Sequence, residues 1–202
     1  MSEPGAPPEL GWSADPGVAL MLRAQAGEVE AFEQLVLAYQ GAAFGMLRRI
    51  LGPREPVEDL AQEAFLRIWR SRERFRPEGR FTTYLYRVTY NLALNRIRDG
   101  ARKPLRPLPL EPDGRPMEPL DPGREPMLEP ADREIWADRI GRALLAIPEN
   151  QRAALVFQHY DGLDLAEIAA ILGLSPPAVK SLLHRARERL RELLAPAWNS
   201  EK

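Results

Sequence analysis

A proline-rich acidic segment divides this 202-residue chain into two parts. Between residues 104 and 130, nine of the 27 residues are proline, acidic side chains lie among them, and no hydrophobic period is present. Proline fixes φ and removes a backbone donor, so this tract predicts an extended path rather than a helix interior or a central strand. We therefore predict two folded domains joined by a flexible linker over residues 101–131. At about 3.1 Å per residue the tract reaches roughly 80 Å.

The part before the linker has helical hydrophobic periods, which predict a bundle over residues 15–100. Residues 1–14 are rich in Pro and Gly and are expected to be disordered. Asp15 and Pro16 suit the N-cap and the first position of a short helix. Further helices are expected from about residue 28 to 51, from 56 to 74, and over FTTYLYRVTYNLALNRIRD, with Thr82 or Thr83 as a cap. Gly41 and Gly45 predict close packing of a neighbour against the second helix.

The formal net charge of -1 conceals a segregation of charge along the chain. Residues 67–103 carry eleven Lys and Arg against three acids, while residues 104–134 carry four against eight. The third predicted helix is acidic in its first half and basic in its second. Complementarity to the helix dipole explains this distribution as well as a binding role does. The fourth interleaves Tyr with Arg and Asn, a combination that can stack unpaired bases and hold their backbone. Half-buried tyrosines with solvated hydroxyls are the structural alternative.

The part after the linker, residues 132–195, ends in a predicted helix-turn-helix. Two helices are expected over residues 132–146 and 149–160. An apolar stripe then runs from Leu165 to Leu172, Gly173 suits the C-terminal turn, and Ser175 suits the next N-cap. From Ser175 to Arg191 there are five Lys and Arg against one acid. A buried helix followed by a basic one is typical of binding in the DNA major groove, although an ordinary helical hairpin with a solvated basic face remains the alternative. Residues 196–202 are expected to form a frayed tail.

Several classes of function find no support in the sequence. The chain has no cysteine and only two histidines, His159 and His184, so it cannot build a disulfide framework or a Cys/His zinc site alone. It has no Gly-rich phosphate loop and no Ser/His/Asp set, so we expect no enzyme activity, no catalytic residue, no metal and no cofactor. The N-terminus lacks a leader pattern, and the longest apolar runs, such as Ala153–Phe157, are too short to insert into a membrane. These features predict a cytoplasmic protein.

Three segments, in this order, resemble the sigma-70 family, and specifically its small extracytoplasmic-function (ECF, group IV) RNA polymerase sigma factors. EDLAQEAFLRIWRSRERF resembles the core-polymerase-binding helix, and GRFTTYLYRVTYNLALNRIRD resembles the promoter-melting and minus-10 helix. IPENQRAALVFQHYDGLDLAEIAAILGLSPPAVKSLLHRARERL resembles the minus-35-binding domain. The resemblance spans about residues 16–195. It implies an all-α fold with two small helical domains, a region 2 four-helix bundle and a region 4 helix-turn-helix.

The resemblance also implies a function and partners. Such a protein binds core RNA polymerase through the clamp helices of the largest subunit and the beta flap. It recognises the minus-35 and minus-10 elements of promoter DNA, promotes melting, and is held by an anti-sigma factor. The alternative is a stand-alone helix-turn-helix regulator, which would usually dimerise to read two half-sites.

The resemblance implies three sets of site residues. Polymerase contacts are implied at Glu58, Asp59, Gln62 and Glu63. Contacts with the minus-10 strand are implied at Arg76, Arg80, Phe81, Tyr84, Arg87, Tyr90, Asn91, Asn95 and Arg98, with the loop 75–81 receiving a flipped base. Contacts with the minus-35 element are implied at Ser175, Pro177, Lys180, Ser181, His184, Arg185 and Arg187. Tyr84, Pro177 and Leu182 stand where the family commonly has Trp, Gly and Arg.

We further expect the two domains to lie apart, each with its own core. One shared core with the proline tract folded inside it would contradict this reading.

Overall fold

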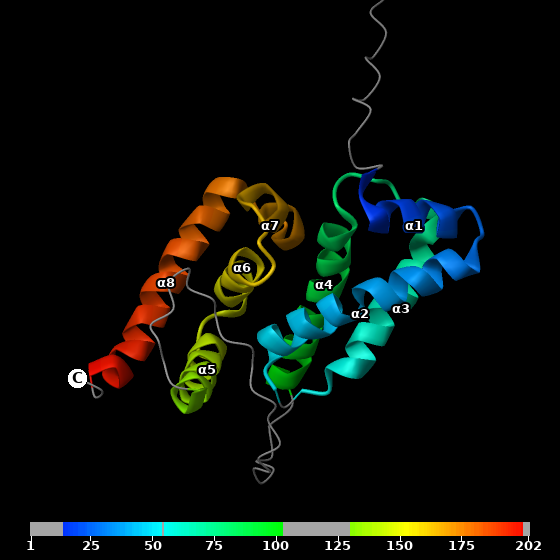
Figure 1. Ribbon diagram of the computed structural model, residues 1–202. Coiled ribbons are helices and arrows are strands. Elements are labelled where there is room, and N and C mark those ends of the chain that lie inside the picture. Colours follow the sequence, from blue (N-terminus) through cyan, green and yellow to red (C-terminus); the bar gives the residue numbers. More distant parts are fainter. Residues whose placement is uncertain (1–13, 54, 103–129, 200–202) are drawn as a thin grey trace, which may run out of the picture.

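The computed structural model describes residues 14–53, 55–102 and 130–199, and the regular elements within these ranges are helices (Figure 1). The predicted disorder of the first residues, most of the predicted linker and the last three residues lie outside the described ranges. The helices fall into two groups, one before and one after the proline-rich tract. Figure 1 shows the first group in blue to green and the second in yellow to red.

The first group is a four-helix bundle made of α1 (Pro16–Gln25), α2 (Val29–Leu51), α3 (Val57–Ser71) and α4 (Phe81–Arg102). A short 3-10 turn, η2 (Arg72–Arg74), continues α3. The carboxylate of Asp15 accepts the Val18 N–H at 2.9 Å, which confirms the predicted start of α1. The bundle is organised around α2, which packs against α1, α3 and α4 and buries its apolar stripe among them. That stripe consists of Ala31, Leu35, Ala43, Met46, Leu47 and Ile50.

The close packing of a neighbour predicted at two glycines of α2, Gly41 and Gly45, is wrong. A Cβ at Gly41 would meet no other atom within 4 Å, and one at Gly45 would meet only the flexible side chain of Arg49. The close approach occurs instead at Gly17, where a Cβ would lie 2.5 Å from the Tyr39 hydroxyl and 2.6 Å from the Phe81 Cβ. Gly17 thus lets the start of α1 sit directly on α2 and α4.

The second group consists of α5 (Pro130–Leu145), α6 (Glu149–His159), α7 (Leu165–Leu172) and α8 (Pro176–Asn199). Gly173 ends α7 in the left-handed conformation, with φ 67° and ψ 36°, as its place after the apolar stripe predicts. The Ser175 hydroxyl accepts the Ala178 N–H at 3.4 Å, so α7 and α8 form the predicted helix-turn-helix. The last helix is longer than predicted and runs through Pro196 to Asn199. A proline this close to a helix end removes one backbone bond and does not stop the helix there.

The two groups are in contact, which corrects the expectation that they lie apart. Helix α4 packs against α7, and α2 packs against α5 and α6. One apolar cluster runs through both groups, from Val18 in α1 to Leu183 in α8. Helices α4 and α2 both carry it across the boundary, and α4 does so because it is apolar or aromatic on more than one side. The proline-rich tract lies outside the described residues, so the second half of the expectation is not tested.

Candidate nucleic-acid interface

A row of cationic, amide and aromatic side chains lies along one face of α4. Its members are spaced three or four residues apart, so they share one side of the helix. We call this row the α4 stripe; it consists of Arg80, Tyr84, Arg87, Asn91, Asn95 and Arg98. Tyr84 is half-buried and the others are exposed. The guanidinium of Arg87 lies 5.8 Å from the centre of the Tyr84 ring, so a cation and a ring are presented side by side.

The structure places two of the predicted minus-10 residues in the core instead of on this face. Phe81 is fully buried, with its ring 4.9 Å from that of Tyr39. Tyr90 is 1% exposed, and its hydroxyl donates to the Asn150 Oδ1 at 2.7 Å. In this arrangement neither ring offers a face to a base. The error over Phe81 follows from the start of the helix. Because α4 begins at Phe81, Thr82 and Thr83, the two predicted caps, both lie inside its first turn.

The loop that precedes α4 is tied to the bundle by a residue that the sequence did not indicate. The amide of Gln25, at the end of α1, donates to the carbonyls of Glu73 at 2.9 Å and Phe75 at 3.3 Å. The Phe75 ring is buried and meets the Tyr84 ring at 5.2 Å. Arg76 remains exposed and donates to the Phe75 carbonyl at 3.0 Å. The loop is therefore held in place beside the start of the α4 stripe.

The helix-turn-helix presents the second cationic face. All the predicted minus-35 residues on α8 and its cap are exposed. Four of them line a shallow depression: Lys180, Ser181, His184 and Arg185. On the opposite side Val179, Leu183 and Ala186 are buried, so the core holds α8 with its basic face outward. Arg187 differs from its neighbours because its guanidinium is hydrogen-bonded to the side-chain carbonyl of Gln158.

The start of α7 is fixed by a capping box. Asp164 accepts the N–H groups of Ala166 and Glu167, each at 2.8 Å, and the Glu167 carboxylate accepts the Asp164 N–H at 3.0 Å. The D-x-x-E spacing at residues 164–167 is a local signal for this motif, which the sequence analysis missed. The motif fixes the direction of α7 and, through the turn at Gly173, that of α8.

The four predicted polymerase contacts lie together on the outer face of α3. Glu58, Asp59 and Gln62 are exposed, and Glu63 is partly exposed. The Glu58 carboxylate lies 3.5 Å from Arg48, and that of Glu63 lies 2.7 Å from Arg67. The hydrogen bond from Arg67 lowers the pKa of Glu63 below its usual value. The Glu63 carboxylate therefore stays ionised at neutral pH.

An exposed leucine, absent from the predicted set, lies on the same face of α3. Leu66 is 47% exposed, and it follows Gln62 by four residues and Glu63 by three. Beyond it, Trp69 is half-buried against Phe32, with ring centroids 4.9 Å apart, and the Arg72 guanidinium covers that indole at 4.0 Å. The available signal was that Leu66 falls outside the buried stripe of α3, so nothing within the bundle accounts for it.

Within the described ranges there is neither a metal site nor a single membrane-spanning helix. No cluster of three or more His, Cys, Asp or Glu side chains there is arranged to hold a metal ion. No individual described helix is long and apolar enough to cross a bilayer, and only the bent pair α7 and α8 meets that criterion, jointly.

Comparisons with known proteins identify the same parts of the chain. Residues 35–103 match the family model for sigma-70 region 2, and residues 137–190 match that for sigma-70 region 4. The chain is 32% identical to the ECF RNA polymerase sigma-E factor of Haemophilus influenzae, over 88% of this chain and 95% of that protein. It is 35% identical to the ECF RNA polymerase sigma factor SigE of Mycolicibacterium smegmatis, over 82% of this chain but only 62% of that longer protein. The fold is similar to that of CnrH in its solved complex with the cytosolic domain of CnrY. The TM-score is 0.64 and the identity is 26%, over 90% of this chain and 99% of that one.

Proposed function

This chain belongs to the sigma-70 family, among the ECF RNA polymerase sigma factors, and from that premise we propose how its surfaces divide the work of transcription initiation. A sigma factor brings core RNA polymerase to promoter DNA and helps to open it. The observation that carries the proposal is the α4 stripe, in which cations, amides and a ring lie on one accessible face beside a fixed loop. We propose that the chain belongs to group IV, which is supported by the matches of residues 35–103 to region 2 and of residues 137–190 to region 4.

The α4 stripe binds the non-template strand of the minus-10 element. Single-stranded DNA is held by cations along its backbone and by rings that stack on its bases. Arg80, Arg87 and Arg98 supply the cations, and Tyr84 supplies the ring. The neighbouring loop, fastened by Gln25 and carrying Arg76, receives one base that has left the stack.

The basic face of α8 binds the minus-35 element as intact duplex. Lys180 and Arg185 lie at its centre and can reach phosphates or the acceptors of guanine in the major groove. Ser181 and His184 lie between Lys180 and Arg185 in the sequence, and their side chains can donate to base edges. Contacts of this kind position the protein and read sequence at the same time.

The outer face of α3 binds the polymerase. Its carboxylates suit a basic surface, which the clamp helices of the largest subunit provide in this family. Leu66 adds an exposed apolar side chain among these charged residues. We also propose that an anti-sigma factor competes for these surfaces, because the chain resembles CnrH, whose solved structure is a complex with the cytosolic domain of CnrY. Acting on polymerase requires the chain to work inside the cell.

The energetics require the polymerase. Opening about five base-pair steps costs roughly 7 kcal/mol at about 1.4 kcal/mol per step, while stacking two bases returns about 1–3 kcal/mol each. The deficit means that the free chain cannot hold promoter DNA open. The chain supplies recognition, and the polymerase supplies the remaining free energy and the chemistry.

The test is run-off transcription. Core polymerase with the purified chain should initiate at discrete sites on genomic DNA, whereas core polymerase alone should not. Arg87→Ala should reduce the open complex without reducing polymerase binding. The absence of specific initiation at any promoter would refute the proposal, and a strong palindromic footprint by the free chain would favour a stand-alone regulator instead.

A further inference from the structure

Gln25 joins the end of α1 to the start of the loop 75–81. Its side-chain amide donates to the Glu73 carbonyl at 2.9 Å and to the Phe75 carbonyl at 3.3 Å, across 48 and 50 positions of the sequence. The nitrogen of a carboxamide carries two N–H donors, so one glutamine can satisfy both carbonyls. Both acceptors belong to the backbone, so the contact fixes the path of the chain rather than the place of one side chain.

Phe75 is held at its ring as well as at its carbonyl. The ring is 5% exposed and meets the Tyr84 ring edge-on, with centroids 5.2 Å apart. The Phe75 carbonyl also accepts the Arg76 guanidinium at 3.0 Å, and a carbonyl oxygen has two lone pairs for two donors. Because ring and carbonyl are both fixed, the chain leaves Phe75 in one direction, next to Tyr84 of the α4 stripe.

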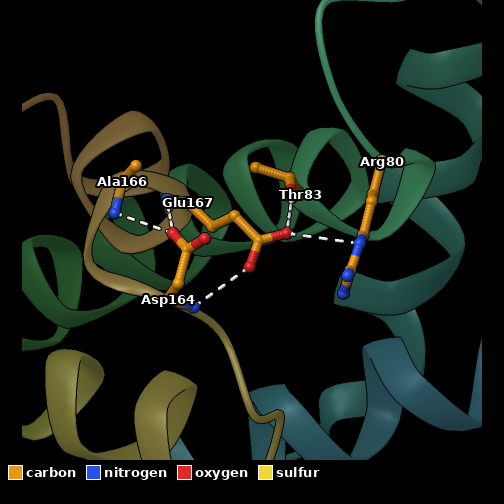
Figure 2. A network of polar contacts seen from close by, with 5 residues as sticks. All are labelled: Arg80, Thr83, Asp164, Ala166 and Glu167. Atoms are coloured by element: carbon orange, nitrogen blue, oxygen red, sulfur yellow. Dashed lines mark hydrogen bonds and ion pairs between the residues drawn. The ribbon is translucent and has the colours of Figure 1, made fainter. Parts of the chain in front are cut away.

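The other end of the loop is fixed by packing. Phe81, the first residue of α4, is fully buried, and Gly17 leaves room for its close approach to α1. Arg80, one position earlier, lies 3.6 Å from the Glu167 carboxylate, which also accepts the Thr83 hydroxyl at 3.5 Å (Figure 2). The Arg80 side chain is 56% exposed, so this ion pair restrains the loop little. Residues 76–80 therefore lie between two fixed ends.

A loop that selects a base does so best when its geometry is already fixed. Ordering flexible residues on binding costs conformational entropy, and this cost is subtracted from the affinity for the correct base. A loop that is free to move can also rearrange around a wrong base, whereas a fixed loop leaves the polar groups of a wrong base unpaired. Holding the loop before DNA arrives therefore raises both affinity and selectivity.

We propose that Gln25 is a positioning residue for base selection. By holding the Glu73 and Phe75 carbonyls, it keeps the loop 75–81 in the conformation that receives a base of the minus-10 element. Gln25 itself is half-buried at the end of α1 and acts through the backbone of the loop. The proposal rests on the proposed function, since it names the residue that determines selectivity at the loop described there.

The first test measures how firmly the loop is held in the free, full-length chain. The amides of Phe75 and Glu78 donate to carbonyls two or three residues earlier, so their hydrogen exchange, followed by NMR, reports local opening. Gln25→Met keeps the length of the side chain and removes both donors, and these amides should then exchange about 5- to 30-fold faster. Gln25→Lys supplies new donors and should restore most of the protection. Gln34→Met, at an exposed glutamine of α2, is the matched control and should exchange like the wild type.

The second test measures base selection with core RNA polymerase. The minus-10 element of a promoter mapped by run-off transcription is randomised, and initiation from this template library is read by sequencing. Exposed loops open at little cost, so the open form predominates once the Gln25 donors are lost. Gln25→Met should therefore lower the base preference at one position of the element by about 3- to 10-fold and leave the other positions unchanged.

Two results would overturn the proposal. The first is an equal exchange rate in Gln25→Met and the wild type. The second is a base preference that stays the same or falls equally at every position, since an equal fall shows a general loss of structure. If the wild-type chain initiates nowhere on genomic DNA, the proposed function fails, whereas the exchange rates still decide whether Gln25 holds the loop.

Discussion

Leu66 provides the sharpest test of the polymerase-binding surface. It lies among four polar side chains on the outer face of α3 and is 47% exposed. No contact within the bundle explains a leucine at this position. If the polymerase covers this face, Leu66→Ala should weaken binding to core polymerase and leave the chain itself folded.

The magnitude follows from the area that remains exposed. Burying a whole leucine side chain contributes about 1.5–3 kcal/mol. Because 47% of Leu66 is still accessible, its burial on a partner would contribute about 0.7–1.4 kcal/mol. Removing the side chain should therefore weaken polymerase binding by about 3- to 10-fold. The stability of the chain should change by no more than about 0.5 kcal/mol, as for most surface substitutions.

The assay is a titration of dye-labelled chain with core RNA polymerase, followed by anisotropy. Leu37→Ala is the matched control, because Leu37 is also an exposed leucine, at 70%, but lies on α2. It should bind like the wild type. Equal affinities for all three chains, or an equal loss in both variants, would show that this part of α3 does not contact the polymerase.

Three further predictions concern DNA binding, the contact between the two groups, and packing. Lys180→Ala should reduce the salt dependence of holoenzyme binding to a duplex promoter by about one unit of slope, as expected for one lost phosphate contact, and an unchanged slope would exclude that contact. Burial raises the pKa of Asp161 above its ordinary 3.8, and the groups that face it are Tyr86 and Arg49. Protonation of Asp161 therefore favours the contact between the two groups of helices below that raised pKa, so the fraction of chains with separated groups should grow as pH rises from about 4 through it. Energy transfer between dyes attached at Gln40→Cys on α2 and Glu192→Cys on α8 would measure this separation, and Asp161→Asn should abolish its dependence on pH. Gly17→Ala should destabilise the chain by about 1–3 kcal/mol in urea unfolding, because its Cβ would overlap two side chains. Gly41→Ala, in open space within α2, should instead stabilise it by about 0.5–1 kcal/mol, and equal effects would refute the packing argument.

The helices and both polar faces could be predicted because their signals are local. Asp15 with Pro16, and Gly173 with Ser175, mark helix ends through bonds that span three or four residues. The outward faces of α3 and α8 follow from a period of 3.6, which a single helix carries by itself. For these parts of the chain, local propensity and tertiary packing agree.

The contact between the two groups could not be predicted in this way. Tyr86 and Asp161 are 75 positions apart, and Tyr90 and Asn150 are 60 apart. The pattern of α4 leaves its tyrosines at the edge of the apolar stripe, where they suit bases or protein equally well. Tyr86 and Tyr90 are buried because both rings pack on Phe157 of α6. The sequence of α6 is already amphipathic by itself, so it does not indicate this additional contact. A long-range contact of this kind leaves no period in the sequence.

The contact between the two groups must be weak if the chain is to work. Each unit of free energy that favours this contact is subtracted from the apparent affinity for any partner that needs the two groups apart. The binding free energy of a nanomolar complex is about 12 kcal/mol. If the contact between the two groups is stable by a few kcal/mol, tight binding of a partner is still possible. If its stability were a large fraction of 12 kcal/mol, tight binding would be lost. The contact between α4 and the second group fits this limit: Arg80, in its ion pair with Glu167, is half-exposed, and one oxygen of the Asp161 carboxylate has no hydrogen-bond partner among the described residues. A better-paired interface would hold the two proposed DNA-binding faces together even on the polymerase, so the chain could not reach the two promoter elements that we assign to them.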